Sequence, residues 1–193
     1  GHANAAVLRR HIVPYPDSIR HQSVLAARWL LLEFLSQPDI RVDTCLFGGF
    51  AFGAYIKPAA MFHTADVDVL VKASRVGPIV QQCIQFVRAG LCQWSPKEVH
   101  AADVAILFPS MTRPSFKLRV FDTNVADLVP WSIGADDKPA SVMEWHVPWI
   151  ELRNGISCCV HVPLFEWLYE RIRHPRVSGG TPGQCAHVLE LAA

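Results

Sequence analysis

Two aspartates, Asp66 and Asp68, stand one residue apart in the apolar run 65–71. Because strand side chains alternate between faces, both carboxylates should point the same way while the intervening valines enter a core. Neighbouring carboxylates repel each other, and such a pair commonly persists because a cation lies between them. All-oxygen sites of this kind suit Mg²⁺ or Mn²⁺, ions that commonly carry substrate phosphates. The spacing therefore predicts a divalent-metal site.

A diglycine, Gly48 and Gly49, precedes the two acids along the chain. We predict a tight turn there, between a strand at 40–47 and a short helix at 50–56, and a second strand at 67–72 that bears the acids. A lone diglycine marks many turns, and a lone pair of alternating acids is often only solvated. Their order and spacing together favour a functional site.

The composition fits a folded domain without a strong preference for nucleic acid. The chain has 193 residues, 51% of them hydrophobic, and a formal net charge of +1. That length and apolar content allow a sizeable core. The near balance of charge does not indicate a strongly basic nucleic-acid binder, although a local basic groove stays open. The longest apolar run, 26–35, is too short and too charged for a bilayer, and no secretory signal is evident, so we expect no membrane association.

Six cysteines are present, and none of them forms a Cys-x-x-Cys motif. No spacing of histidine and cysteine resembles a zinc motif. Most of the cysteines stand in apolar runs, which is typical of small buried hydrophobic residues in a reducing compartment. We therefore expect an intracellular, cytoplasmic location.

The order of the predicted elements indicates an α/β (α+β) fold, a mixed β-sheet flanked by helices. We expect an N-terminal extension at 1–17, one domain at 18–175, and a C-terminal loop with a short helix at 176–193. The other predicted elements are a helix at 18–37, a helix at 79–89 capped by Gly90, strands at 104–108, 116–121 and 156–162, a helix at 163–172, an ambiguous segment at 126–133, and a strand pair within 141–151.

The residues Gly48, Gly49, Asp66 and Asp68, in this order of strand, diglycine, short helix and acidic strand, resemble the nucleotidyltransferase superfamily with its polymerase-beta-like fold. The motif spacing is most similar to the small toxin and abortive-infection branch of that superfamily. The resemblance extends over roughly 18–172, although the specific motifs occupy only a small part of it.

The resemblance implies a reaction. Metal ions held by the carboxylates would activate a nucleoside triphosphate, and a nucleoside monophosphate would pass to an unknown acceptor, which could be an RNA end, a protein or a small molecule. The backbone at Gly48 and Gly49, and the helix start that follows, would receive the phosphates. Arg171 is the nearest match to a basic residue that holds the triphosphate in the family, and Lys72 is a further candidate for phosphate binding.

The superfamily also expects a third carboxylate on a later strand. The natural match, 116–120, places Arg119 at the acidic position. Asp122 follows three residues later, and a bulge or the end of the strand could bring it into the site as the third catalytic and metal-binding acid. Asp103 and Asp127 are weaker candidates.

Two interpretations stay open. The first is a metal-dependent nucleotidyltransferase. The second is a catalytically degenerate protein of the same fold that serves as a nucleotide-binding or protein-interaction module. Phe50 and Arg119 favour the second, because Phe50 replaces the usual hydroxyl residue and Arg119 would place a fixed positive charge where an ion should lie.

Overall fold

The computed structural model describes residues 19–56, 66–94, 104–107, 115–131, 139, 141–151 and 157–173. The predicted extension at 1–17 and the predicted tail at 176–193 lie outside these residues, so both boundaries stay predictions. The elements are α2 (Ile19–Leu35), α3 (Pro38–Arg41), β1 (Thr44–Phe47), α4 (Gly48–Ala51), η1 (Phe52–Ala54), β2 (Val67–Lys72), η2 (Ala73–Arg75), α5 (Val76–Trp94), β3 (Val104–Leu107), β4 (Phe116–Val120), β5 (Thr123–Trp131), β6 (Val142–Glu151), β7 (Ser157–Pro163) and α6 (Phe165–Arg173).

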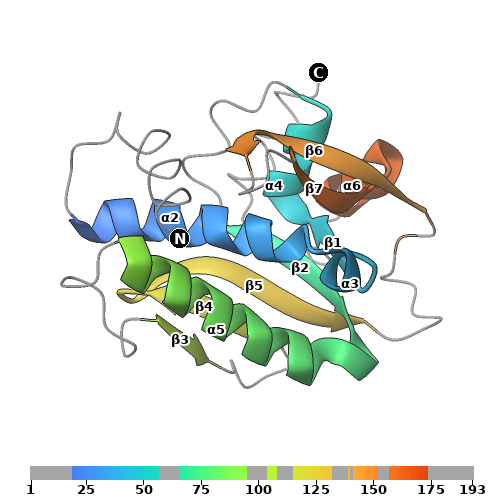
Figure 1. The fold of residues 1–193 in the computed structure, drawn as a ribbon. Helices are drawn as coiled ribbons and strands as arrows, with labels where there is room; N and C mark the ends of the chain where they lie inside the picture. Colours follow the sequence, from blue (N-terminus) through green and yellow to red (C-terminus); the bar gives the residue numbers. More distant parts are fainter. Residues whose placement is uncertain are drawn as a thin grey trace.

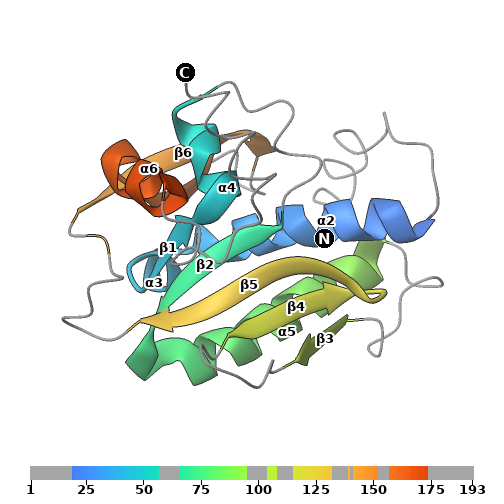
Figure 2. The same ribbon diagram turned by 180° about the vertical axis from the view of Figure 1, so that it is seen from behind.

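Five strands form one mixed sheet in the order β1-β2-β5-β4-β3. Strands β2 and β5 run parallel, and the other neighbouring pairs are antiparallel. Helices α2 and α5 lie together over one face of this sheet, in front of it in Figure 1 and behind it in Figure 2. The predicted α/β class, a mixed sheet flanked by helices, is confirmed.

The contact between α2 and α5 explains a glycine that the sequence analysis misinterpreted. Gly90 is not the C-cap of a helix at 79–89, because α5 continues to Trp94. A Cβ atom at position 90 would collide with the side chain of Leu30 on α2. The glycine therefore allows the two helices to approach closely, and the rings of Phe34 and Phe86 meet nearby with centroids 5.7 Å apart.

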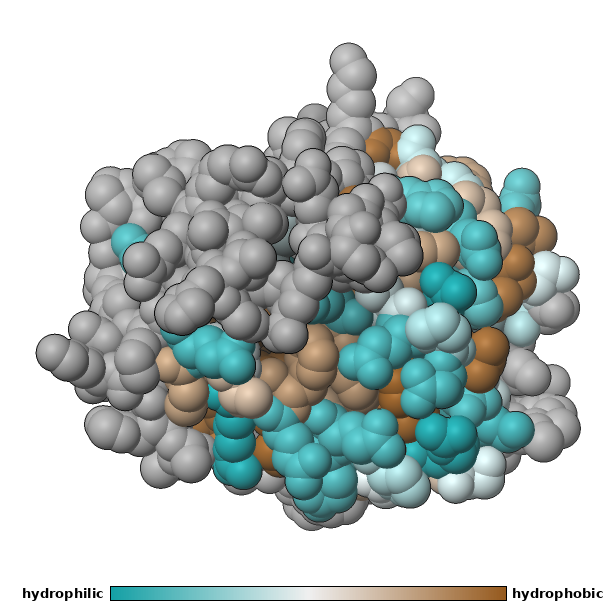
Figure 3. All heavy atoms as spheres, in the orientation of Figure 1, coloured by the Kyte–Doolittle hydropathy of each residue, from teal (hydrophilic) through white to brown (hydrophobic). Residues whose placement is uncertain are grey.

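Alternation along β2 separates a buried face from a polar one. Val67, Val69 and Val71 are completely buried in the core, and Leu128 of β5 is buried with them. Helix α5 turns a hydrophilic surface to solvent, and hydrophilic side chains cover much of the lower part of the molecule in Figure 3. Leu70, which shares the face of Asp68, is buried as well, so the polar part of that face is confined to Asp68 and Lys72 at the two ends.

A second, two-stranded sheet, β6 with β7, packs against β1. The predicted strand pair within 141–151 is wrong, because this segment forms one continuous strand that pairs with β7. Trp145 of β6 is buried, and its ring lies 5.9 Å from the ring of Phe50 on α4. The small sheet is therefore attached to the segment that follows the diglycine.

Other predicted boundaries shift for local reasons. The strand expected at 40–47 begins only at Thr44, because Pro38 starts a single helical turn at Pro38–Arg41. Residues 126–131 of the ambiguous segment belong to β5, and its last two residues lie outside the described part of the chain. The cysteines that the structure describes form no disulfide. Within the described ranges, no helix has the length and apolar character needed to cross a membrane.

Candidate active site

Strand register brings three acids together. Asp68 of β2 lies beside Asp127 of β5 in the parallel pair, and Asp66 immediately precedes β2. One carboxylate oxygen from each of the three lies within 4.8 Å of the others. Side chains of neighbouring residues in register share a face of a sheet, so this group lies on the face of β2 opposite its buried valines.

The acid that lies with Asp66 and Asp68 in this group is Asp127, which was the weaker candidate from the sequence, whereas Asp122 lies outside the group. Asp122 is exposed in the turn between β4 and β5, where its φ of 63° places it in the left-handed region. A register shift does occur in β4, directly before Arg119, but it pairs Arg119 with Asn124 and leaves Asp122 at the tip of the turn. The chain reverses there, so the acid beside Asp68 comes from the strand after the turn.

Two polar residues that the sequence analysis missed support the acids. Asn124 donates from Nδ2 to Oδ2 of Asp66 at 2.7 Å and to Oδ2 of Asp127 at 3.3 Å. The Nζ atom of Lys117 lies 3.6 Å from Oδ1 of Asp127. Lys117 lies beside Asp127 only through the pairing of β4 with β5, and Asn124, three residues before Asp127 in β5, reaches Asp66 only through the fold.

Arg28 supplies a buried positive charge near the acids. It belongs to α2, and only 6% of it is exposed. Burial lowers the pKa of its guanidinium to about 10, and the charge of Asp66 opposes this effect. A single arginine among the apolar residues of a helix can be recognised in the sequence. Its proximity to Asp66 cannot be recognised there, because it depends on the fold.

Burial and the neighbouring acids raise the pKa values of Asp68 and Asp127. Burial, and then the charges of Asp66 and Asp127, raise the pKa of Asp68 well above its ordinary range. Burial also raises the pKa of Asp127, against the opposing effect of Lys117. Burial and the neighbouring acids therefore outweigh the charge of Lys117 at Asp68 and Asp127, and a divalent cation would favour the deprotonated form of both.

Gly48 lets the chain pass directly beside Asp68. Its φ is 69°, a conformation that side-chain-bearing residues rarely adopt, and a Cβ atom there would collide with the carboxylate of Asp68. Gly49 follows in α4, which is a single turn. We expected both glycines to let phosphates approach the backbone. The structure shows that Gly48 must lack a side chain because the Asp68 carboxylate occupies that space.

The remaining predicted residues lie elsewhere. Lys72 ends β2 four residues after Asp68, about 13 Å along the strand. Arg171 lies on α6 with its guanidinium 4.2 Å from the ring centre of Trp167. Phe50 is buried in the core and so does not occupy a position facing the acids.

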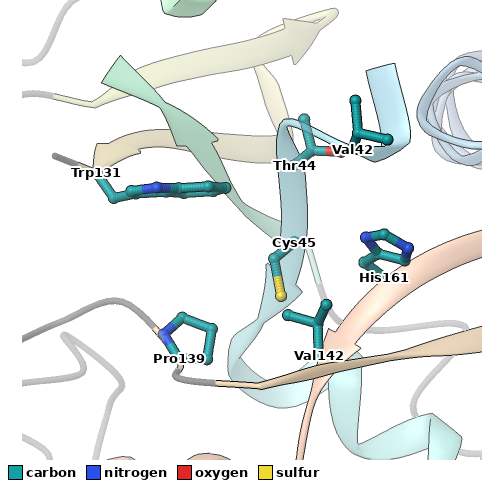
Figure 4. A pocket seen from close by; sticks show the side chains of 7 residues that line it. All are labelled: Val42, Thr44, Cys45, Trp131, Pro139, Val142 and His161. Atoms are coloured by element: carbon teal, nitrogen blue, oxygen red, sulfur yellow. The ribbon is translucent and has the colours of Figure 1, made fainter. Parts of the chain in front are cut away.

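A cavity of about 240 Å³ lies at the start of β1, near the end of β2 that is farther from Asp68. Cys45 of β1, Trp131 at the end of β5, and Val142 and His161 of the small sheet are among the residues that line it (Figure 4). Burial raises the pKa of the Cys45 thiol to about 12, so this cysteine is not an activated nucleophile.

No protein-family model matches the chain, and no curated protein matches it. Among solved structures, the chain is similar to the crystal structure of the Megavirus polyadenylate synthase, with 13% sequence identity and a TM-score of 0.48. The alignment covers 86% of this chain and 31% of that chain. The chain thus spans about a third of the length of that protein.

Proposed function

We propose that this protein is a metal-dependent nucleotidyltransferase, which transfers a nucleoside monophosphate from a nucleoside triphosphate to an acceptor. The observation that carries this proposal is the convergence of Asp66, Asp68 and Asp127 within 4.8 Å. Gly48 stands beside them with φ 69°. A compact group of oxygens next to an open backbone turn suits the joint binding of a divalent ion and phosphates.

The residues present fit Mg²⁺ or Mn²⁺. All donors are carboxylate oxygens, the kind that these ions prefer. Oδ1 of Asn124 is buried and accepts no hydrogen bond from the described residues, and Oδ1 of Asp127 is buried with the Lys117 ammonium 3.6 Å away, so both oxygens can accept a further partner. A bound ion would supply a Lewis acid that polarises a phosphoryl oxygen and lowers the pKa of an attacking hydroxyl.

The chain's own residues hold this group ready. Asn124 orients Asp66 and Asp127 through its amide, and Lys117 compensates the charge of Asp127 from one side. The position of Arg28 adds a buried counter-charge near Asp66. These contacts reduce the reorganisation that ion binding requires.

We propose that the triphosphate is bound by the backbone turn at Gly48 and Gly49 and by Arg171 of α6. Helix α6 packs against α4, the turn that the diglycine opens, so Arg171 belongs to an element that neighbours this turn. Lys72 is a weaker candidate, because it lies at the far end of β2 from the acids.

The test uses each nucleoside triphosphate with Mg²⁺ or Mn²⁺, and it measures nucleotide binding by calorimetry, pyrophosphate release, and transfer of an α-phosphate label to RNA, protein or small molecules. Asp127→Asn should abolish release. The matched control is Asp122→Asn, at an exposed left-handed position that asparagine tolerates, and it should retain release. Release that persists in the Asp66→Ala/Asp68→Ala double variant would remove this mechanism.

One observation favours the degenerate alternative. Arg119 pairs with Asn124 across the sheet and so shares the face of the acids, and its Nε atom is buried without a hydrogen-bond partner among the described residues. A fixed positive charge there would compete with an ion. Nucleotide binding without pyrophosphate release, under every condition above, would support a nucleotide-binding module in place of the enzyme.

A further inference from the structure

The outward face of the small sheet gathers a different set of ligating side chains. In the antiparallel pair of β6 and β7, Glu144 lies opposite His161, and His146 lies opposite Cys159. Opposed residues share a face, and so do residues two apart on one strand. Register alone therefore places these four side chains on one side of the sheet.

Three of these side chains are close enough to bind one ion. Ligand atoms of Glu144, His146 and Cys159 all lie within 4.8 Å of one another. Donors around a tetrahedral zinc ion stand about 3.4 to 3.8 Å apart, so small side-chain rotations would close the site. A thiolate, an imidazole and a carboxylate together suit zinc-like ions, unlike the oxygen-only group at Asp66.

The opposite face of the same strands is fixed in the core. Trp145 packs against Phe50, and Val160 and Val162 are buried. The strands that carry the ligands are therefore held rigidly from behind. Glu144 and His146 are exposed, whereas Cys159 is 5% exposed, so an ion can enter from solvent and meet a shielded sulfur.

His161 connects this group to the cavity. It lies across from Glu144 and also lines the cavity of about 240 Å³, into which its ring projects beside Val142 (Figure 4). A three-ligand ion keeps a fourth position free for water or another ligand, and the cavity offers space next to it.

One neighbouring charge opposes a cation. Arg41 of α3 contacts Cys159 through its side chain and also acts on His161. The positive charge of Arg41 would weaken cation binding. Removal of this charge should therefore raise the affinity for the metal ion.

We infer that Glu144, His146 and Cys159 form a second metal site, specific for a zinc-like divalent ion, with its fourth position open beside His161 and the cavity. The site stands apart from the carboxylate group and does not depend on the proposed transferase activity.

The test titrates the full chain, without any added histidine tag, with Co²⁺ as a spectroscopic substitute for Zn²⁺. We expect one equivalent to produce the near-ultraviolet charge-transfer absorption of a thiolate–cobalt bond, and Zn²⁺ to displace it. Cys159→Ser should abolish the band. The Cys92→Ser/Cys185→Ser variant, which changes cysteines outside the group, should keep it.

Cys159→Ser changes a buried side chain and could disturb folding. Variants at His146, which is exposed, and at Arg41, which is partly exposed, therefore provide an independent test. His146→Ala changes an exposed side chain and should weaken binding at least about tenfold, with an unchanged circular dichroism spectrum. Arg41→Gln should tighten binding. Absence of the band in the unchanged chain, its survival in Cys159→Ser, its loss in the control, or equal affinity in His146→Ala would overturn the inference.

Discussion

The two faces of β2 show how one strand can serve both stability and chemistry. On one face, Val67, Val69 and Val71 are fully buried in the core. On the other, Asp68 lies beside Asp127 and Asp66 with raised pKa values at Asp68 and Asp127. The first face stabilises the fold, and the second costs stability because like charges are held together. A strand can carry this repulsion only where its other face is well packed.

The largest effect should come from the polar face. Asp68→Asn should lower pyrophosphate release roughly a thousandfold, which corresponds to about 4 kcal/mol of lost transition-state stabilisation. The same variant should raise the thermal unfolding midpoint of the metal-free protein at neutral pH, because asparagine keeps the shape and removes the repulsion. A variant that lost both activity and stability would contradict the contrast between the faces.

The pH dependence of that stability difference follows from the raised pKa of Asp68. The folded state favours the protonated carboxyl, so the metal-free chain loses stability as pH rises from the ordinary aspartate range to the raised pKa. The advantage of Asp68→Asn should therefore be largest at neutral pH and shrink toward acid. Thermal melts with a chelator across this range provide the measurement, and an advantage that grows toward acid would refute the assignment.

Gly48→Ala tests how closely the backbone approaches the polar face. A left-handed φ costs a side-chain-bearing residue about 1–2 kcal/mol, and the added methyl group would displace the Asp68 carboxylate. We expect lower stability and a large loss of metal affinity. Gly77→Ala is the matched control, because position 77 lies in α5 with open space around it, and it should be neutral or slightly stabilising.

Val69→Ala addresses the buried face alone. Truncation of a fully buried valine should cost about 2 kcal/mol in unfolding by urea. Metal affinity, measured by calorimetry below the unfolding transition, should stay the same. A change in affinity as large as that in Gly48→Ala would mean that the two faces are not separable.

The smallest effect should come from Lys117→Gln. Lys117 lowers the pKa of Asp127, so its removal should raise that pKa further and shift the acidic limb of metal binding to higher pH. Because the ammonium is partly exposed, we expect a change of only a few-fold at neutral pH. Metal affinity measured as a function of pH would reveal it, and a shift toward lower pH would contradict the role of Lys117.

Local patterns in the sequence predict one strand of the site well. The alternation at 67–72 and the two acids identify β2, and the diglycine identifies the turn before α4. These features depend on neighbouring residues, which a sequence displays directly.

The third acid depends on pairing between distant strands, and the sequence does not display that. Asp127 reaches Asp68 only because β5 adds in parallel beside β2, whereas Asp122 is nearer in sequence to the expected position. The predicted role of Gly90 as a C-cap is wrong for a similar reason, because its contact is with Leu30 of another helix. The Glu144, His146 and Cys159 group also has no motif spacing, because its ligands meet across two strands.

The amide of Asn124 has a consequence for the resting protein. By donating to both Asp66 and Asp127, it occupies part of the role of a cation without carrying a charge. This neutral amide keeps the two carboxyl groups aligned when no ion is bound. A divalent ion would replace its hydrogen bonds with stronger interactions. Asp66 and Asp127 would therefore need little rearrangement to take up the divalent ion that we propose.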